Sequence, residues 1–321
     1  MLFRSHLALT VLPTVFAAPA ASGNPFEGKS FCANSKYAAK LEETINSFAD
    51  VSCSTPLTYQ LHKSSRKAQT VELVVYNLPD RDCSAKTSDG ELKLDQDGAI
   101  KYKQSEPTFA IILEPDSLAN IVTNMAVPKG RHRIRHLKIA IPNMHRYIDA
   151  SHGGWLGWDD NLLPSAKLFA KVLELASGNS TTKPKVRGLA TNVSNYNAYI
   201  ANPRENFTEW SNIGLPAKFI VDQGRAGKLA VRQEWGQWCN IKNAGFGTRP
   251  TTNTNSTLVD ALVCVKPGGE SDGTSDPTSA RFDEMCAGPV AEVPAPEAGA
   301  WFNDYVKRLV LNANLTLPIS W

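Results

Sequence analysis

After its first 23 residues the sequence has no apolar run long enough to cross a membrane. A spanning helix needs about 20 consecutive apolar residues, and no later stretch of the 321 residues reaches that length. A strong charge of one sign is also missing, because the net charge is +3 and the pI is near 8.4. Nucleic-acid binding usually requires a concentrated basic surface. We therefore expect neither a membrane partner nor a nucleic-acid partner.

Common catalytic and metal-binding motifs are absent as well. The chain has no GxSxG, HExxH, P-loop or GxGxxG-plus-helix arrangement. Its six cysteines are widely spaced and form no CxxC pair, which argues against a small disulfide scaffold and a zinc site of that kind. His132 and His136 lie four residues apart, but no carboxylate lies between them and no third ligand is near. We predict no metal and no other cofactor.

The first residues are typical of a secretory leader. Arg4 supplies a positive start, residues 7–17 are apolar, and small residues follow. We predict a signal peptide over residues 1–22, a single domain over residues 23–321, and a secreted, extracellular protein. Secretion permits disulfides and glycosylation. Five N-x-S/T sequons fit that route, at Asn179, Asn192, Asn206, Asn255 and Asn314.

Short apolar runs that alternate with polar segments predict an α/β fold. Strands are expected at 71–76, 110–113, 186–190, 218–221 and 262–265, with a further short strand that ends at 147–149. Helices are expected within 24–50, from 117, over about 164–176 and over roughly 299–313. Polar residues follow the strands, at Asp82, Asp116, Asp149, Asn192, Asp222 and Lys266. The carboxyl ends of parallel strands meet at one face, so we predict a parallel barrel or sheet with one site there.

The segment at 109–120, FAIILEPDSLAN, shows this arrangement best. Ala110–Leu113 predicts a buried strand, Pro115 ends it because proline has no N–H to donate, and Ser117 starts a helical pattern. Asp116 therefore lies where the active sites of α/β proteins are found. On this segment alone, a helix-capping role for Asp116 is the alternative.

Carboxylates together with tryptophans favour chemistry on sugars. Hydrolysis of a glycosidic bond uses two carboxyl groups that flank the bond, and flat aromatic rings suit the apolar faces of pyranose rings. No nucleophile of another type stands beside a base in these segments. The polar residues at the strand ends therefore predict a carbohydrate-directed site.

Ten segments, taken in order, resemble glycoside hydrolase family 6. VVYNLPDRDCSA at 74–85 and AIILEPDSLA at 110–119 match the family's two signature motifs. The further segments are YIDASHGGWLGW, RGLATNVSNYN, KFIVDQGRAGK, RQEWGQWCN, GFGTRPTTNT, VKPGGESDGTSD, RFDEMCAG and PAPEAGAWF. The resemblance covers roughly residues 76–312. It implies an inverting β-1,4-glucanase on a distorted (β/α) barrel of parallel strands.

The resemblance also implies a role for individual residues. Asp116 matches the general acid, and Asp82 matches the neighbouring carboxylate that keeps the acid protonated by like-charge repulsion. Asp272 matches the candidate base, acting directly or through a chain of water. Substrate contacts are implied for Tyr76, Arg81, Ser88, His152, Trp155, Trp158, Asn192, Trp238, Lys266 and Glu270. The alternatives are a structural ion pair for Arg81 and Asp82 and a core position for Trp158.

Cysteines follow the family pattern only in part. Cys239 and Cys286 match one family disulfide. Cys83 matches half of another, but Gly130 stands at the partner position. Cys83 is then a free thiol or pairs with Cys32, Cys53 or Cys264, and these alternatives stay open.

Four regions of the chain are shorter than the family pattern or unrecognisable in it, at 57–69, 103–108, 130–142 and 202–216. Six residues between Tyr102 and Phe109 are too few for a βαβ crossover, which needs about 10–12 residues. We therefore expect an incomplete barrel, or strands connected in another way.

Two functions are compatible with these observations. The first is a secreted cellobiohydrolase-type enzyme that acts on β-1,4-glucan chains, because 84–101 and the segment between Cys239 and Cys286 match the loops that enclose the family's tunnel. The second is a catalytically impaired or non-catalytic glucan-binding paralogue, because scaffold segments are missing. For either function we expect a monomer.

Overall fold

A computed structural model describes residues 23–29, 31, 35–47, 70–75, 108–113, 115–123, 144–177, 186–199 and 218–314. The predicted signal peptide and the predicted tunnel loop at 84–101 lie outside the described residues. Within these ranges, no helix is both long and apolar enough to pass through a bilayer.

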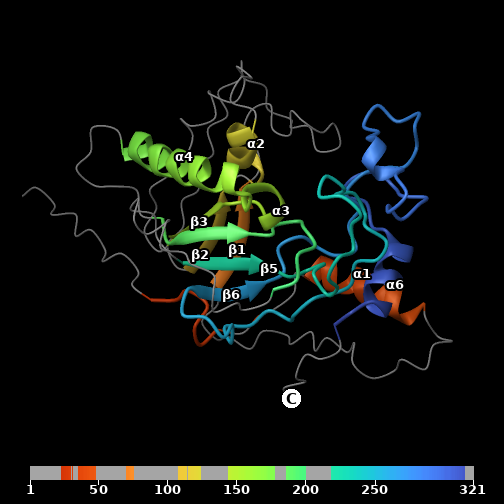
Figure 1. The fold of residues 1–321 in the computed structure, drawn as a ribbon. Coiled ribbons are helices and arrows are strands. Elements are labelled where there is room, and N and C mark those ends of the chain that lie inside the picture. The colour runs from red at the N-terminus through yellow and green to blue at the C-terminus, as the bar shows by residue number, and fades with distance from the viewer. Residues whose placement is uncertain are drawn as a thin grey trace, which may run out of the picture.

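Six parallel strands form one sheet in the order of the sequence (Figure 1). They are β1 (Thr70–Val75), β2 (Thr108–Leu113), β3 (Met144–Asp149), β4 (Gly188–Thr191), β5 (Phe219–Asp222) and β6 (Val259–Val263). A doubly wound sheet reverses its strand order at a switch point, whereas here each strand is added to the same side of the sheet, as in the wall of a barrel. The predicted α/β fold of parallel barrel strands is confirmed.

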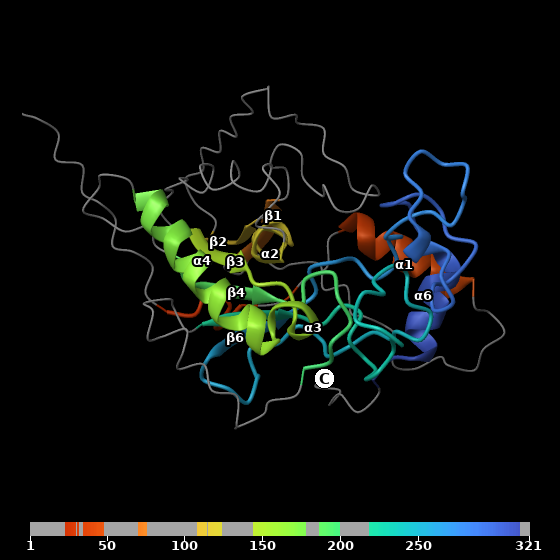
Figure 2. The ribbon, with the colours of Figure 1, turned by 45° about the horizontal axis from the view of Figure 1, so that its top comes forward.

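Helices cover one face of this sheet. Both α2 (Ser117–Thr123) and α4 (Asp159–Ser177) lie on that face, with the short α3 (Gly153–Leu156) between β3 and α4 (Figure 2). The core there joins helix residues such as Ile121, Phe169 and Val172 to strand residues such as Ile148 and Leu189. Burying side chains of this size stabilises the fold by about 1.5–3 kcal/mol each.

The other face of the sheet is the interior of the curved wall. Ala110, Ile112, Tyr147, Ala190 and Ile220 form a second buried cluster on it. Side chains of a strand alternate between faces, so the residue two positions after Tyr147 and the residue two positions after Ile220 also face inward. Those residues are Asp149 and Asp222, at the carboxyl ends of β3 and β5.

The remaining helices lie beside the sheet. Figure 1 shows α1 (Ser35–Asn46) next to α6 (Asn303–Leu311), with α4 on the far side of the sheet. A 3-10 turn, η2 (Glu284–Cys286), lies in the segment before α6. The predicted helix within 24–50 is confirmed as α1, whose Leu41 is buried and whose Tyr37 lies edge-on to Trp301.

Several predicted boundaries differ from the observed ones, and contacts in the structure explain three of them. The strand β6 ends at Val263 and contains Asp260, whose charge is satisfied by Arg187 at 2.7 and 2.8 Å and by the Tyr147 hydroxyl at 2.7 Å. The helix α4 starts at Asp159, before Pro164, because the Trp158 carbonyl accepts the first backbone N–H groups. The helix α6 starts at Asn303 because Trp301 forms a β-bridge to Glu270 and the Phe302 N–H donates to the carbonyl of Gly269 at 2.7 Å.

Candidate active site

The described part of the chain includes most of the predicted site. Tyr76, Arg81, Asp82 and Ser88 lie outside the described residues. The others follow the carboxyl ends of the strands, and the structure brings them together in two groups. One surrounds Asp116 and the tryptophans near α3, and the other surrounds Asp272.

Asp116 is tied to a second carboxylate, Asp149. The backbone N–H of Asp116 donates to Oδ2 of Asp149 at 2.9 Å, and the N–H of Ser151 donates to the same atom at 3.1 Å. The other oxygen of Asp149 is buried and has no hydrogen-bond partner in the structure. Burial, followed by the negative charge of Asp116, raises the pKa of Asp149 well above its usual value. The two carboxyl groups therefore oppose each other's ionisation.

Three strand ends in a row carry a residue in the left-handed region. Asp116 follows β2 with a φ of +61°, Ser151 follows β3 with +53°, and Asn192 follows β4 with +62°. This conformation costs a non-glycine residue free energy and is concentrated at functional sites. Here it turns the chain sharply at the face where the polar side chains gather.

A chain of hydrogen bonds joins these strand ends. The N–H of Asn192 donates to the carbonyl of Ser151 at 2.6 Å, and the Asn192 amide donates to the carbonyl of Asp222 at 2.6 Å. The Asp222 carboxylate in turn accepts the N–H groups of Ser194, Gly224, Val265 and Lys266 at 2.9–3.2 Å. Asp222 therefore fixes the loops after β4, β5 and β6 relative to one another.

Asn192 was predicted to contact substrate. Both hydrogens of its amide are used within the chain, since it also donates to the carbonyl of Asn197 at 2.9 Å. It is buried at 4% exposure, so the sequon at this position would be inaccessible to a glycan. A substrate contact of Asn192 stays a prediction, and its observed role is to hold the loop.

Asp272 is the most heavily bonded carboxylate of the second group. Its Oδ2 accepts the Arg225 guanidinium at 2.6 Å, the Tyr196 hydroxyl at 2.9 Å and the backbone N–H of Asn240 at 2.9 Å. Its Oδ1 faces the Lys266 ammonium at 3.6 Å. Burial alone would raise the pKa of Asp272, but the charges of Arg225 and Lys266 outweigh burial and lower it. Asp272 is therefore a fixed negative charge.

Arg225 is buried beside this carboxylate. Its exposure is 2%, its guanidinium lies 4.4 Å from the centroid of the Tyr196 ring, and it also donates to the carbonyl of Ser194. Burial disfavours its charge, yet the pKa of Arg225 is raised because Asp272 stabilises the cation. A buried pair of this kind fixes geometry, since loss of one partner leaves an uncompensated charge.

Lys266 and Glu270 complete this group. Burial lowers the pKa of Lys266, and the negative charges of Asp272 and Glu270 act in the opposite direction. Glu270 forms a β-bridge to Trp301, at the start of the segment that leads into α6. A cation between two carboxylates can donate hydrogen bonds to sugar hydroxyls.

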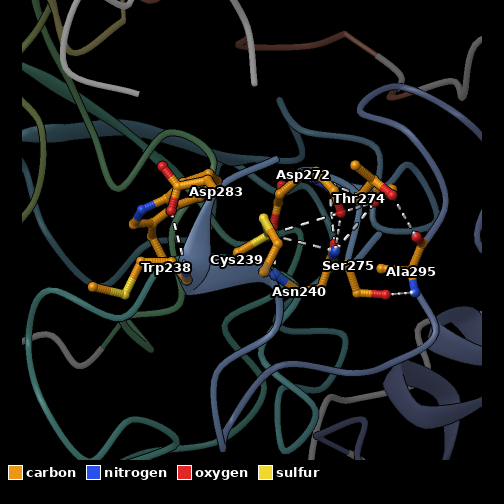
Figure 3. Close-up of a disulfide and its surroundings, with 12 residues drawn as sticks. Trp238, Cys239, Asn240, Asp272, Thr274, Ser275, Asp283 and Ala295 are labelled. Atoms are coloured by element: carbon orange, nitrogen blue, oxygen red, sulfur yellow. Dashed lines mark hydrogen bonds between the residues drawn. A yellow bond between two sulfur atoms is a disulfide. The ribbon is translucent and has the colours of Figure 1, made fainter. Parts of the chain in front are cut away.

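The predicted disulfide between Cys239 and Cys286 is present, and it lies beside Asp272 (Figure 3). Asn240, next to Cys239, donates its N–H to Asp272 and accepts the N–H of Asp272 at 2.8 Å. The disulfide thus anchors the backbone that holds this carboxylate. Trp238 precedes it, and the one proton of the Tyr196 hydroxyl is shared between the Trp238 carbonyl at 2.8 Å and Oδ2 of Asp272 at 2.9 Å. Cys264 has a free thiol, so it does not pair with Cys83.

Aromatic side chains gather around α3. The His152 ring lies 6.3 Å from the Trp155 ring and 6.5 Å from the Trp235 ring, measured between centroids. Burial, followed by the charge of Arg232, lowers the pKa of His152 to about 3, so its imidazole is neutral in ordinary buffers. Trp158 is 53% exposed, which contradicts a core position for it. Neutral rings with open faces suit an uncharged sugar.

Comparison with known proteins identifies the chain. Glycosyl hydrolases family 6 matches residues 33–313. The chain belongs to glycosyl hydrolase family 6. It is 40% identical to Exoglucanase 3 of Agaricus bisporus over 355 residues, covering 92% of this chain and 80% of that protein. It is also 40% identical to the 1,4-beta-D-glucan cellobiohydrolase CEL6B of Podospora anserina over 367 residues, covering 93% and 84%.

Solved family 6 structures resemble the whole described fold. CcCel6C, a glycoside hydrolase family 6 enzyme from Coprinopsis cinerea, is 45% identical with a TM-score of 0.79, covering 91% of this chain and 98% of that chain. The CcCel6A catalytic domain, complexed with p-nitrophenyl beta-D-cellotrioside, is 38% identical with a TM-score of 0.75, covering 92% and 99%. The predicted family is confirmed, and the protein is a glycoside hydrolase.

The alignments also agree with the shortened regions. The alignment with the Agaricus bisporus protein runs over 355 positions, although this family 6 chain has only 321 residues. The relative therefore contains residues that this chain lacks. The four short regions themselves lie outside the described residues, apart from Thr108.

Three functionally placed residues were missing from the predicted site of this family 6 chain. The sequence predicts Asp149 only as a polar residue at a strand end, and it predicts no role for Arg225 and Tyr196, which lie inside matched segments. Alternation along β3 could have placed Asp149 on the inner face. No local pattern could have paired Arg225 with Asp272, because 47 residues separate them.

Proposed function

We propose that this protein is a secreted, monomeric hydrolase of β-1,4-glucosidic bonds in cellulose that acts by inversion, in the manner of a cellobiohydrolase. Family membership supports the bond type, and the names of the relatives, exoglucanase and cellobiohydrolase, support action on chain ends. The observation that carries the proposal is the pairing of Asp116 with Asp149 at the carboxyl ends of β2 and β3.

Asp116 is the proton donor in this proposal. A general acid must hold its proton at working pH, and a neighbouring carboxylate favours the protonated form. Asp149 is joined to Asp116 through a backbone hydrogen bond of 2.9 Å, and its pKa is raised, so the pair keeps one shared proton at a pH where an exposed carboxyl has lost it. Asp82, which lies outside the described residues, is proposed as a second neighbour. The proton of Asp116 passes to the glycosidic oxygen as the bond to the anomeric carbon breaks.

Asp272 acts on the opposite side of the sugar. An inverting enzyme activates a water on the face away from the leaving group. Three donors occupy Oδ2 of Asp272, so its Oδ1, which faces Lys266 at 3.6 Å, is the atom open to a water. Its low pKa keeps it ionised. Asp272 accepts the water's proton, directly or through further water, and its fixed charge favours the cationic transition state.

The remaining predicted residues bind the glucan. Trp155, Trp158 and Trp238 offer flat faces to glucosyl rings, and the neutral His152 offers a ring nitrogen to hydroxyls. Nδ1 of His152 is itself buried, so Nε2 is the ring nitrogen proposed to meet a substrate hydroxyl. Lys266 and Glu270 donate to and accept from further hydroxyls. Tyr76, Arg81, Ser88 and Asn192 are proposed to complete the contacts.

Sugar release from amorphous cellulose tests this function. The purified protein should release soluble sugar, while Asp116→Ala should release at least about a hundredfold less, which follows from the loss of a general acid. Proton NMR of a fresh digest should show the α-anomer first, and viscosity should fall slowly relative to reducing ends. Equal, near-zero release by two folded proteins would favour a non-catalytic glucan-binding protein. Release of the β-anomer first would overturn inversion.

A further inference from the structure

An exposed tryptophan outside the predicted site lies against one of its members. Trp235 and Trp158 meet edge to face, with ring centroids 6.4 Å apart and ring planes at 88°. Their exposures are 51% and 53%. Two large apolar rings that are half exposed beside a candidate active site indicate a surface that binds a ligand.

Trp235 is held in place from two sides. A Cβ atom on Gly154 would come within 1.9 Å of the Trp235 ring, so the indole lies directly on the backbone of α3, where only glycine fits. The Arg232 guanidinium lies 4.8 Å from the Trp235 ring centroid, a cation–π distance. Trp235 is therefore fixed although half of it is exposed.

Arg232 is itself clamped. Its two terminal nitrogens donate to Oδ1 of Asn195 at 2.8 Å and to Oδ1 of Asn197 at 2.6 Å, both in the loop after β4. Its guanidinium also lies 5.9 Å from the Tyr196 ring centroid. These contacts connect the loop after β4, through Arg232 and Trp235, to the surface of α3.

Trp158 is oriented by contacts with Gly154 and Trp235. Its indole N–H donates to the carbonyl of Gly154 at 2.8 Å, and its ring packs against Trp235. This hydrogen bond alone would leave the exposed face of the Trp158 ring without a packing partner that limits its motion. The edge-to-face contact with Trp235 supplies this partner.

We infer that Trp235, clamped by Arg232, is a positioning residue that holds the Trp158 ring open as a preformed platform for a glucosyl unit of a longer glucan chain. This rests on the proposed function, because it requires that Trp158 stacks on sugar. A platform fixed before binding spares the side-chain ordering that a mobile indole would need. The effect should therefore fall on the binding of long chains and not on bond cleavage.

A double-mutant cycle on cellohexaose, with cellotriose as the short substrate, tests this inference. Trp158→Ala should raise KM for cellohexaose about tenfold, and Trp235→Ala about threefold to tenfold, both with kcat unchanged within about twofold. The double variant should match Trp158→Ala alone, because Trp235 acts through Trp158. Trp235→Phe should recover most of the loss, since phenylalanine keeps an aromatic edge.

The control is Leu229→Ala, because Leu229 is 64% exposed and lies in the same loop region. This change should leave KM and kcat for cellohexaose unchanged. An unchanged KM for Trp235→Ala beside a raised KM for Trp158→Ala would overturn this inference and leave the proposed function intact. Additive effects in the double variant would also overturn it, because Trp235 would then contact sugar itself. An unchanged KM for Trp158→Ala would overturn both the platform and its positioning residue.

Discussion

The backbone N–H of Asp116 donates a hydrogen bond to Oδ2 of Asp149 at 2.9 Å. This single contact joins the strand end that carries the proposed acid to the neighbouring strand end. It also brings two carboxyl groups close enough for the charge of Asp116 to raise the pKa of Asp149. The pair is therefore expected to titrate as a unit.

Replacing Asp149 with asparagine should narrow the pH range of activity. The amide keeps an oxygen for the Asp116 N–H but removes one of the two carboxyl groups that share the last proton of the pair. The basic limb of the kcat profile should move to lower pH by about one unit. The measurement is kcat against pH on cellotetraose. A basic limb that stays in place would show that Asp149 does not influence the acid.

Replacing Arg225 with lysine should disturb Asp272. Lysine keeps the charge but cannot reproduce the contacts to both Asp272 and the Ser194 carbonyl. Because the guanidinium hydrogen bond to Asp272 is lost, the pKa of Asp272 should rise, so the acid limb of the kcat profile should move to higher pH. We expect kcat to fall about tenfold to a hundredfold.

Circular dichroism and the melting temperature of the Arg225→Lys variant would establish that it is folded. The matched control is Arg281→Lys, since Arg281 pairs with Glu297 at 3.8 Å on the exposed surface and should be neutral. An acid limb that does not move in the folded Arg225→Lys variant would contradict the assignment of Asp272.

Glu72 in β1 should cost stability at neutral pH. Burial, followed by the charge of Asp222, raises its pKa from 4.5 to about 8, and its Oε1 has no hydrogen-bond partner in the structure. Below pH 4.5 the folded and unfolded chains both hold the proton. Above that pH the unfolded chain releases it first, so stability falls as the pH rises from 4.5 toward 8.

Glu72→Gln should therefore stabilise the protein at pH 7 by on the order of 1–3 kcal/mol and have little effect at pH 4. Urea unfolding at the two pH values measures this. Glu43→Gln is the control, because Glu43 lies exposed on α1, where it pairs with Lys40 at 3.2 Å. A gain of equal size at both pH values would show that the carboxyl's ionisation is not the cause.

Loss of the disulfide should weaken both the fold and the site. Cys239→Ser with Cys286→Ser opens a cross-link between residues 47 positions apart. We expect the free energy of unfolding to fall by about 2–4 kcal/mol, and kcat to fall because Asn240 no longer holds Asp272 firmly. Cys264→Ser, which removes a free thiol, should stay within about 1 kcal/mol. Unchanged stability in the double variant would contradict this role.

The sequence was enough to predict much of the fold. Apolar runs that end in polar residues predicted the parallel strands, and the periodicity of Leu41 and its neighbours predicted α1. Asp260 misled the strand prediction because its partners, Arg187 and Tyr147, are distant in sequence. Local patterns record which residues are apolar, but they do not record which distant group neutralises a buried charge.

In the candidate site too, local sequence patterns predict the residues but not the long-range contacts between them. Motifs predicted Asp116, Asp272 and the tryptophans, since residue type and order carry that information. The contact between Asp116 and Asp149 and the clamp of Arg232 on Trp235 depend on how loops from different strands meet. That arrangement is set by long-range packing, so it became visible only in the structure.

The central claim is that Asp116 donates the proton to the departing sugar. The most direct test compares Asp116→Ala with the unmodified protein on cellotetraose and on 2,4-dinitrophenyl cellobioside. The dinitrophenolate leaves without protonation, so the variant should lose about a hundredfold or more on cellotetraose and less than about tenfold on the aryl substrate. An equal loss on both substrates would contradict the account, because it would show that Asp116 does not assist the leaving group.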